Sequence, residues 1–224
     1  MAQAGIHGLV GMAVRKWAPQ SEWLVLGIVL GNLFPDTDNL AVAAATVAKL
    51  PTEGLHRTFT HSLFTILTIL VIFYLVAVIT KKPRWKTLGI GLGTGVLMHI
   101  LLDLLIWFNG VEILWPIPSW VNLWEGISPG ATFELWMLTA EFLLIGLYFL
   151  TLDWLARRQK TNANFLTALR TWMIASFALF VVLTGLGFLM KSGFQIIAGA
   201  FYLVMLGAAM GVTIRMRQTI EAKA

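Results

Sequence analysis

The sequence predicts an all-α fold, a polytopic bundle of helices embedded in a membrane. Hydrophobic residues make up 58% of the 224 residues and charged residues only 12%, with a mean hydropathy of +0.80. A water-soluble domain of this size could not cover so much apolar surface with polar groups. The apolar runs lack the alternation of barrel strands, whereas helices satisfy their own backbone hydrogen bonds in lipid. We expect about five full spans plus two short N-terminal helices in one domain, residues 1–224.

The first two apolar stretches are too short to cross a bilayer. The first ends at Arg15 and Lys16, so its basic residues come last, the reverse of a secretory signal. The second, from about Glu22 to Phe34, stops at Pro35, which breaks the helical hydrogen-bond ladder. Each would be roughly 20 Å long as a helix, less than the hydrocarbon thickness. We predict two half-membrane or re-entrant helices.

Five longer apolar segments follow, each about 20 residues long and therefore able to span the hydrocarbon core. They are Thr58 to Thr80, Leu88 to Phe108, Phe133 to Leu152, Leu166 to Met190 and Phe194 to Ile214. Every second connection is basic: residues 81–86, residues 157–160 and the tail with Arg215 and Arg217. Because Lys and Arg favour cytoplasmic loops, we expect a cytoplasmic C-terminus.

The connection over residues 109–130 has no Lys or Arg, so it should face outward. Tryptophans gather in and beside it, as expected for rings at a membrane interface: Trp107, Trp115, Trp120 and Trp124. The net charge of +5 comes from residues at the ends of apolar segments, so we expect the lipid bilayer as a partner and no nucleic acid. The chain has no cysteine, so a metal would need nitrogen and oxygen ligands.

Two pairs of polar residues in apolar surroundings are candidate metal ligands. His99 and Asp103 lie four residues apart on one predicted helix, so their side chains share a face. Asp36 and Asp38 follow Pro35, where the chain leaves a short helix and both carboxylates can turn toward one point. Each pair also fits a structural interpretation, as a His-Asp pair between two helices or as a polar turn leaving the membrane.

A third motif, His56-Arg57-x-x-x-His61, lies at the start of the first long span. We expect His56 on the entering loop and His61 on the first helical turns, from where both imidazoles could converge. Arg57 could hold a phosphate or carboxylate through two hydrogen bonds, or could form a structural ion pair.

The loop charges predict that these motifs meet at one depth near the outer surface. His61 begins its span on the outer side, and the next helix carries His99 and Asp103 in its outer half. Asp36 reaches the same level if the second short helix runs outward from Arg15 and Lys16, and His7 reaches it if the first short helix is antiparallel to the second. A cluster of His and Asp inside a helical bundle is typical of a metal-water site.

Two glutamates on the following span, Glu134 and Glu141, lie seven residues apart and share a helix face. Glu134 should lie near the outer surface, where it could be a ligand, a partner of a ligand or a general base. Glu141 lies deeper, and there we expect it to be protonated or hydrogen-bonded to another helix.

The order of the motifs resembles the bacterial and archaeal family of inner-membrane-bound metal-dependent hydrolases, which is similar to zinc-dependent phospholipase C and single-strand nucleases. The resemblance covers residues 1–108 and rests on His7, Pro35-Asp36-x-Asp38, His56-Arg57-x-x-x-His61-Ser62 and His99-x-x-x-Asp103. The family commonly has Gly where this chain has Thr58. The resemblance implies a prokaryotic inner membrane, two or three zinc-like ions and hydrolysis of phosphoester bonds.

The hypothesis from the sequence is a membrane-embedded metal-dependent hydrolase of phospholipase type, acting on a phosphoester bond of a lipid or lipid-linked substrate. Its cofactor would be a divalent metal, zinc first, with manganese or iron as alternatives. The expected ligands are His7, Asp36, Asp38, His56, His61, His99 and Asp103, and the expected catalytic residues are Arg57 together with Asp38 or Glu134 as base. The alternatives are a transporter or proton relay that uses the same cluster, and a scaffold in which the cluster only holds helices together.

Overall fold

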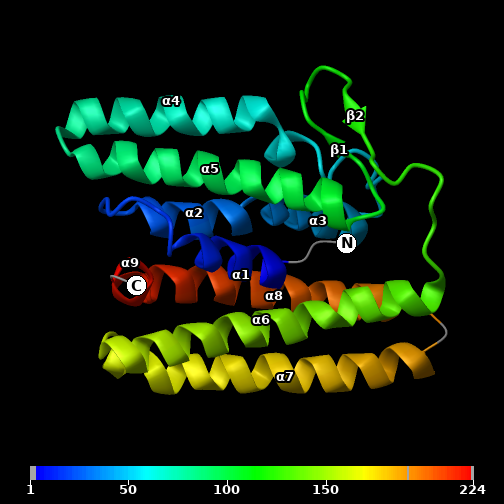
Figure 1. Cartoon of the computed structure of the whole chain (residues 1–224). Helices are drawn as coiled ribbons and strands as arrows, with labels where there is room; N and C mark the ends of the chain where they lie inside the picture. Colours follow the sequence, from blue (N-terminus) through cyan, green and yellow to red (C-terminus); the bar gives the residue numbers. More distant parts are fainter. Residues whose placement is uncertain (1–3, 191, 223–224) are drawn as a thin grey trace.

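A computed structural model describes residues 4–190 and 192–222 as a layered bundle of helices that run nearly side by side (Figure 1). The helices of the first half are α1 (Ala4–Val14), α2 (Leu24–Leu33), η1 (Pro35–Asp38), α3 (Asn39–Val47), η2 (Phe59–His61), α4 (Leu63–Thr80) and α5 (Pro83–Ile106). The second half contains α6 (Ala131–Gln159), η3 (Ala163–Phe165), α7 (Leu166–Leu189), α8 (Phe194–Arg215) and α9 (Arg217–Glu221).

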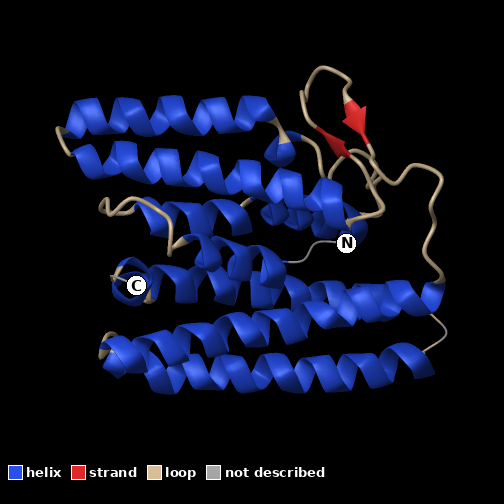
Figure 2. Ribbon diagram, viewed as in Figure 1, coloured by secondary structure: helices blue, strands red, loops and turns tan. Residues whose placement is uncertain are grey.

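The predicted all-α membrane bundle is confirmed. Five helices in the described part of the chain are long and apolar enough to cross a membrane, namely α4, α5, α6, α8 and α7 with its preceding turn. The two short N-terminal helices are also present as α1 and α2. Almost all of the regular structure is helical, as Figure 2 shows. The exception is a small antiparallel hairpin of β1 (Val111–Glu112) and β2 (Trp120–Val121), which hydropathy alone does not predict.

The predicted start of the first span at Thr58 is wrong by five residues. The helix α4 begins at Leu63, because the Ser62 side chain accepts a hydrogen bond from the Phe64 backbone N–H at 3.2 Å and caps the helix there. Residues 59–61 form the separate turn η2, so His61 lies before the span. The short helices α3 and α9 were also not expected, since neither is long or apolar enough to read as a span.

The helices α2 and α5 pack so closely that their backbones touch at glycines. A Cβ atom on Gly31 would collide with the backbone carbonyl of Leu92, and one on Gly95 would collide with that of Ile28. Small residues at such a crossing let two helices approach closely inside a membrane. This contact matters for the site, because it brings the end of α2 against the helix that carries His99.

The helices α6, α7 and α8 enclose the main apolar core together with α1 and α2. Its largest buried side chains include Phe142, Tyr148 and Phe149 of α6, and Met205 of α8. By contrast, α4 packs beside α5 with none of its residues buried, as expected for a helix that faces lipid.

The two ends of the bundle differ in charge. The turns at residues 81–86 and 157–160 lie at one end with α9, on the left in Figure 1, whereas the β-hairpin lies at the other end. The ends of α2 and α5 and the turn η2 lie toward the hairpin end. The predicted polar residues therefore gather at the end of the bundle away from the basic turns.

Candidate metal centre

Five of the predicted ligands from four separate segments converge in one buried cluster. His7 comes from α1, Asp36 from η1, His61 from η2, and His99 and Asp103 from α5. Each is at most 2% exposed. Their donor atoms form two overlapping groups that share His99, and the atoms of each group lie within 4.8 Å of one another: His7, His99 and Asp103 form one group, and Asp36, His61 and His99 form the other.

Imidazole nitrogens and carboxylate oxygens face one another inside this cluster. The Nε2 atoms of His61 and His99 are 3.1 Å apart. His7 stacks on His99 with ring centroids 3.7 Å apart, and its Nε2 lies 3.1 Å from Oδ1 of Asp103. The other oxygen of Asp103 lies 3.5 Å from His61 Nε2 and 3.6 Å from His99 Nε2.

The outer nitrogens of His61 and His99 are held by acceptors, which fixes the tautomer of each ring. His99 Nδ1 lies 2.7 Å from the Asn32 backbone carbonyl, which can only accept, so this nitrogen donates. His61 Nδ1 lies 2.9 Å from Thr60 Oγ1 and 3.3 Å from Asp38 Oδ2. The Thr60 hydroxyl donates to Asp38 Oδ2 at 2.9 Å, so it accepts from His61.

It follows that the two neutral rings would direct lone pairs at each other across 3.1 Å, an arrangement that needs a cation to be stable. A proton can fill this role. Burial lowers the pKa of His61, but the contacts with Asp103 and Asp38 outweigh it and raise the pKa to about 9. A divalent metal can fill the same role, because ligand histidines typically donate their outer N–H to a carbonyl or carboxylate, as these two do.

The spacing and chemistry of the donors also fit a metal. The separation of 3.1 Å between the two nitrogens is close to the roughly 3.3 Å expected for two imidazoles on one tetrahedral zinc ion. Neither oxygen of Asp36 accepts a hydrogen bond within the described residues, and His7 Nδ1 also lacks a hydrogen-bond partner there. Buried polar groups are usually satisfied, so a buried carboxylate that accepts no hydrogen bond and lies 3.8 Å from His99 Nε2, beside His61, favours a ligand role.

Asp38 and His56, also predicted as ligands, lie in the layer around the converging groups. Asp38 accepts from His56 Nδ1 at 2.7 Å, the Arg57 backbone N–H at 3.0 Å and the Thr60 hydroxyl. Burial raises the pKa of Asp38, but the hydrogen bonds from His56 and His61 outweigh it and hold the pKa well below its ordinary value. The expectation of a free carboxylate base is therefore not met, because its oxygens already accept several donors.

Arg57 is buried in the same layer, with its side chain 2% exposed. Its Nε lies 3.4 Å from Oδ2 of Asp103, and its Nη1 donates to the Asn109 carbonyl at 2.9 Å. The guanidinium also lies 5.8 Å from the ring of Trp107, which is buried and so does not serve as a membrane-interface ring. Arg57 was expected either to hold a phosphate or carboxylate through two hydrogen bonds or to form a structural ion pair. The structure contains the ion pair, with Asp103.

The loop that carries Arg57 has an unusual backbone. Arg57 has φ of 63°, in the left-handed region. The next residue, Thr58, has φ of −115° and its hydroxyl donates to the Gly54 carbonyl at 2.9 Å. Threonine is therefore compatible with this position, where the resembling family commonly has Gly.

The two glutamates of α6 have different surroundings. Glu134 is exposed in the first turn of α6 and belongs to neither converging group, so the structure does not bring this predicted base to the cluster. Glu141 is buried and accepts a hydrogen bond from the Gly5 backbone N–H at 3.0 Å. The expectation that it bonds to another helix agrees with this contact to the N-terminus of α1.

Three residues of the site were missed by reasoning from the sequence. Asn32 acts through its backbone carbonyl, which leaves no side-chain signal. Thr60 lies inside the His56–His61 motif, and its hydroxyl beside a histidine was the available clue. Tyr202 of α8 is buried and is influenced electrostatically by Asp36 and Glu141, although it lies far from every motif in the sequence.

The fold and the cluster define a class: a polytopic helical membrane protein with a buried His/Asp centre at one end of the bundle. A sequence model of the family described as YdjM inner membrane protein matches residues 2–217. The chain therefore belongs to the YdjM inner membrane protein family and is an integral inner membrane protein. No curated protein and no solved structure matches the chain. The finer resemblance to metal-dependent hydrolases stays a prediction.

Proposed function

We propose that this protein is a membrane-embedded metal-dependent hydrolase that cleaves a phosphoester bond of a lipid or lipid-linked substrate. One observation carries the proposal: the Nε2 atoms of His61 and His99 face each other at 3.1 Å while both outer nitrogens are held by acceptors. Beside them lies the buried carboxylate of Asp36, which accepts no hydrogen bond within the described residues and lies 3.8 Å from His99 Nε2. The same donors suit zinc first, and manganese or iron as alternatives.

The residues of the chain divide into those that would hold the metal and those that orient them. His7, Asp36, His61, His99 and Asp103 would hold one or two ions, since the two donor groups share His99. Asp38 and Thr60 fix the ring of His61, and Asp38 also holds His56. A bound divalent ion supplies Lewis acidity, which makes water a usable nucleophile near neutral pH and withdraws charge from phosphoryl oxygens.

Arg57 would neutralise negative charge at the same place. Its guanidinium lies beside Asp103 and is buried, so a substrate phosphate that reached the cluster would meet a fixed positive charge in a medium of low dielectric. The ion pair with Asp103 also holds that ligand in position.

A lipid substrate is favoured by the surroundings of the cluster. The helix α3 follows η1 directly and exposes apolar side chains, with Leu40 59% exposed and Val47 86% exposed. Such a helix is suited to the membrane interface, where a lipid headgroup would lie. By the loop-charge rule, we propose that the C-terminus is cytoplasmic and that the cluster lies toward the outer side.

The test compares two isosteric substitutions, Asp103→Asn in the cluster and Asp153→Asn at the basic end of α6. Elemental analysis and hydrolysis of bis-p-nitrophenyl phosphate would be measured on the detergent-purified proteins. We expect near-stoichiometric metal and metal-dependent turnover in the wild type and in Asp153→Asn, and loss of both in Asp103→Asn.

Two other outcomes would contradict the proposal in different ways. Metal without turnover, together with net ion movement in sealed vesicles, would identify the transporter or relay that uses the same cluster. If the purified wild-type protein contains no metal, the cluster serves only to hold helices together.

A further inference from the structure

The helices α1 and α6 touch at one end and separate toward the other. Near the start of α1, a Cβ atom on Gly5 would lie 2.5 Å from the backbone nitrogen of Ile145, and one on Gly8 would lie 3.2 Å from the Tyr148 ring. Further along α1 the two helices leave a groove of about 520 Å³ between them. The groove lies toward the basic end of the bundle, away from the His/Asp cluster.

The walls and the end of this groove differ in chemistry. Apolar atoms dominate the walls, which include Leu9 and Met12 of α1 and Leu155 of α6. Lys16 and Arg158 lie at its basic end, where Arg15 also lines it. An apolar groove that ends in cationic side chains matches an acyl chain joined to an anionic headgroup.

Aromatic side chains lie beside the basic residues of the groove and indicate where this end lies in the membrane. Trp154, which also lines the groove, is 54% exposed, and the Arg158 guanidinium lies 5.4 Å from its ring centre. The Lys16 ammonium lies 5.3 Å from the ring centre of Trp17. Tryptophans beside basic residues are typical of the headgroup level of a membrane.

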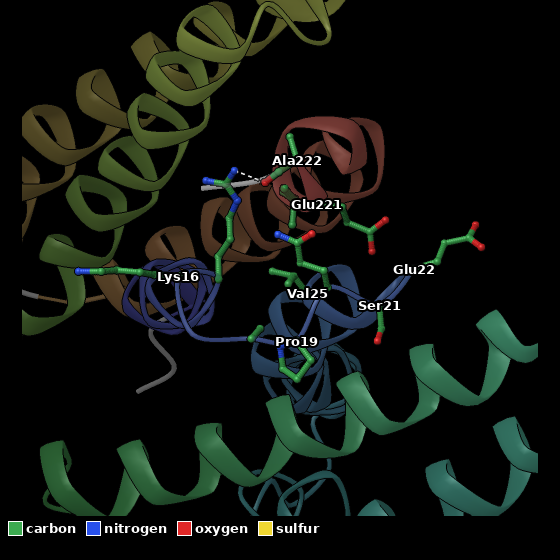
Figure 3. A pocket seen from close by; sticks show the side chains of 11 residues that line it. Lys16, Pro19, Ser21, Glu22, Val25, Glu221 and Ala222 are labelled. Atoms are coloured by element: carbon green, nitrogen blue, oxygen red, sulfur yellow. Dashed lines mark hydrogen bonds between the residues drawn. The ribbon is translucent and has the colours of Figure 1, made fainter.

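Two of the three cations that line the groove, Lys16 and Arg158, lack carboxylate partners within residues 4–190 and 192–222. The nearby carboxylate of Asp153 pairs instead with Arg157 at 2.7 Å and Arg170 at 3.5 Å, so it does not neutralise Arg158. Figure 3 shows the adjacent pocket, where the neighbouring Arg15 hydrogen-bonds to the Ala222 carbonyl while Lys16 extends away from the other lining side chains. Lys16 therefore lines both the groove and this adjacent pocket.

We propose that the groove between α1 and α6 binds one anionic glycerophospholipid from the bilayer. An acyl chain lies along Leu9, Met12 and Leu155, and the headgroup phosphate lies between Lys16 and Arg158. The lipid fills the space where α1 separates from α6 and so supports the short helix that carries His7. This site is independent of the proposed hydrolase activity.

The test is native mass spectrometry of the full-length protein titrated with dioleoylphosphatidylglycerol, with dioleoylphosphatidylcholine or with glycerol phosphate. We expect one phosphatidylglycerol to remain bound, phosphatidylcholine to bind more weakly, and glycerol phosphate not to bind because it has no acyl chain. The double variant Lys16→Ala/Arg158→Ala should weaken the retained phosphatidylglycerol roughly 10- to 30-fold.

Two further variants test whether lipid retention depends on the position of the basic residues in the groove or only on the number of positive charges. Lys81→Ala/Lys82→Ala removes two charges at the same end of the bundle but outside the groove, and should leave the retained lipid unchanged. Ala13→Phe, which fills the groove without changing charge, should displace the lipid. Equal losses in both double variants, or retention in Ala13→Phe, would overturn the proposal; metal content and turnover report on the hydrolase separately.

Discussion

In the part of the bundle formed by α6, α7 and α8, the buried side chains are mostly large and apolar, whereas between α2 and α5 they are often small or ionisable. Phe142 and Phe149 are fully buried in the first region. In the second region Gly31 and Gly95 bring two backbones together, and His99 is fully buried beside them. We expect the first region to tolerate exchange between apolar residues of similar size. In the second region, a single added Cβ atom or a lost hydrogen bond would change how α2 and α5 pack.

The difference explains how a membrane bundle can position ionisable groups. His99 reaches the Asn32 carbonyl at 2.7 Å because the glycines let α5 lie directly against α2. An ionisable residue in a membrane is costly unless its partners are in place. Backbone contact at the glycines therefore fixes the position of His99 relative to Asn32 more closely than packing between apolar side chains would.

The largest expected effect tests this backbone contact. In Gly95→Leu, the new Cβ would collide with the Ile28 carbonyl and would lie 2.7 Å from the Asn32 nitrogen, so α2 and α5 must separate. We expect the free energy of unfolding in detergent to fall by about 4 kcal/mol or more, measured by tryptophan fluorescence during denaturation.

The control for this change is Gly207→Leu in α8, where a Cβ would meet nothing within 4 Å. Its stability should stay within about 1 kcal/mol of the wild type. Similar losses in both variants would mean that the α2–α5 contact has no special role.

An intermediate effect is expected from the ion pairs of the two regions. Arg57 and Asp103 form a buried pair, whereas Arg157, paired with Asp153, is 44% exposed. Arg57→Met removes the guanidinium beside the buried Asp103 carboxylate and should cost about 3 kcal/mol of unfolding free energy. Arg157→Met should leave the denaturation midpoint unchanged, because exposed pairs contribute little. Equal midpoints for the two variants would contradict the distinction between the regions.

Hydropathy predicted the spans well because the length of an apolar run is a property of the sequence alone. It missed the start of α4, since the cap at Ser62 depends on a hydrogen bond to Phe64 and not on hydropathy. It also missed α3, because this helix of nine residues is too short to stand out as an apolar segment, even though it carries the exposed side chains Leu40 and Val47.

For the site, the motif spacings predicted which residues meet but not what each one bonds to. Loop charge and the four-residue spacing of His99 and Asp103 were enough to bring the cluster to one end of the bundle. The occupation of Asp38 by several donors could not be predicted, because two of them arise from the local fold of the His56–His61 loop. Glu134 is exposed, in keeping with its expected place near the outer surface, but helix periodicity alone could not show that it belongs to neither donor group.

The smallest expected effect concerns a hydroxyl that orients a proposed ligand. Thr60→Val removes the donor to Asp38 and the acceptor of His61 Nδ1, without touching the converging donors themselves. Loss of such an outer partner should weaken zinc binding by about tenfold, measured by competition with a fluorescent chelator. Thr68→Val is the matched control, because the exposed Thr68 hydroxyl of α4 donates to the Phe64 carbonyl of its own helix and to no other group in the described part of the chain. If Thr60→Val binds zinc as tightly as Thr68→Val and the wild type, the Thr60 hydroxyl does not orient His61 for the metal.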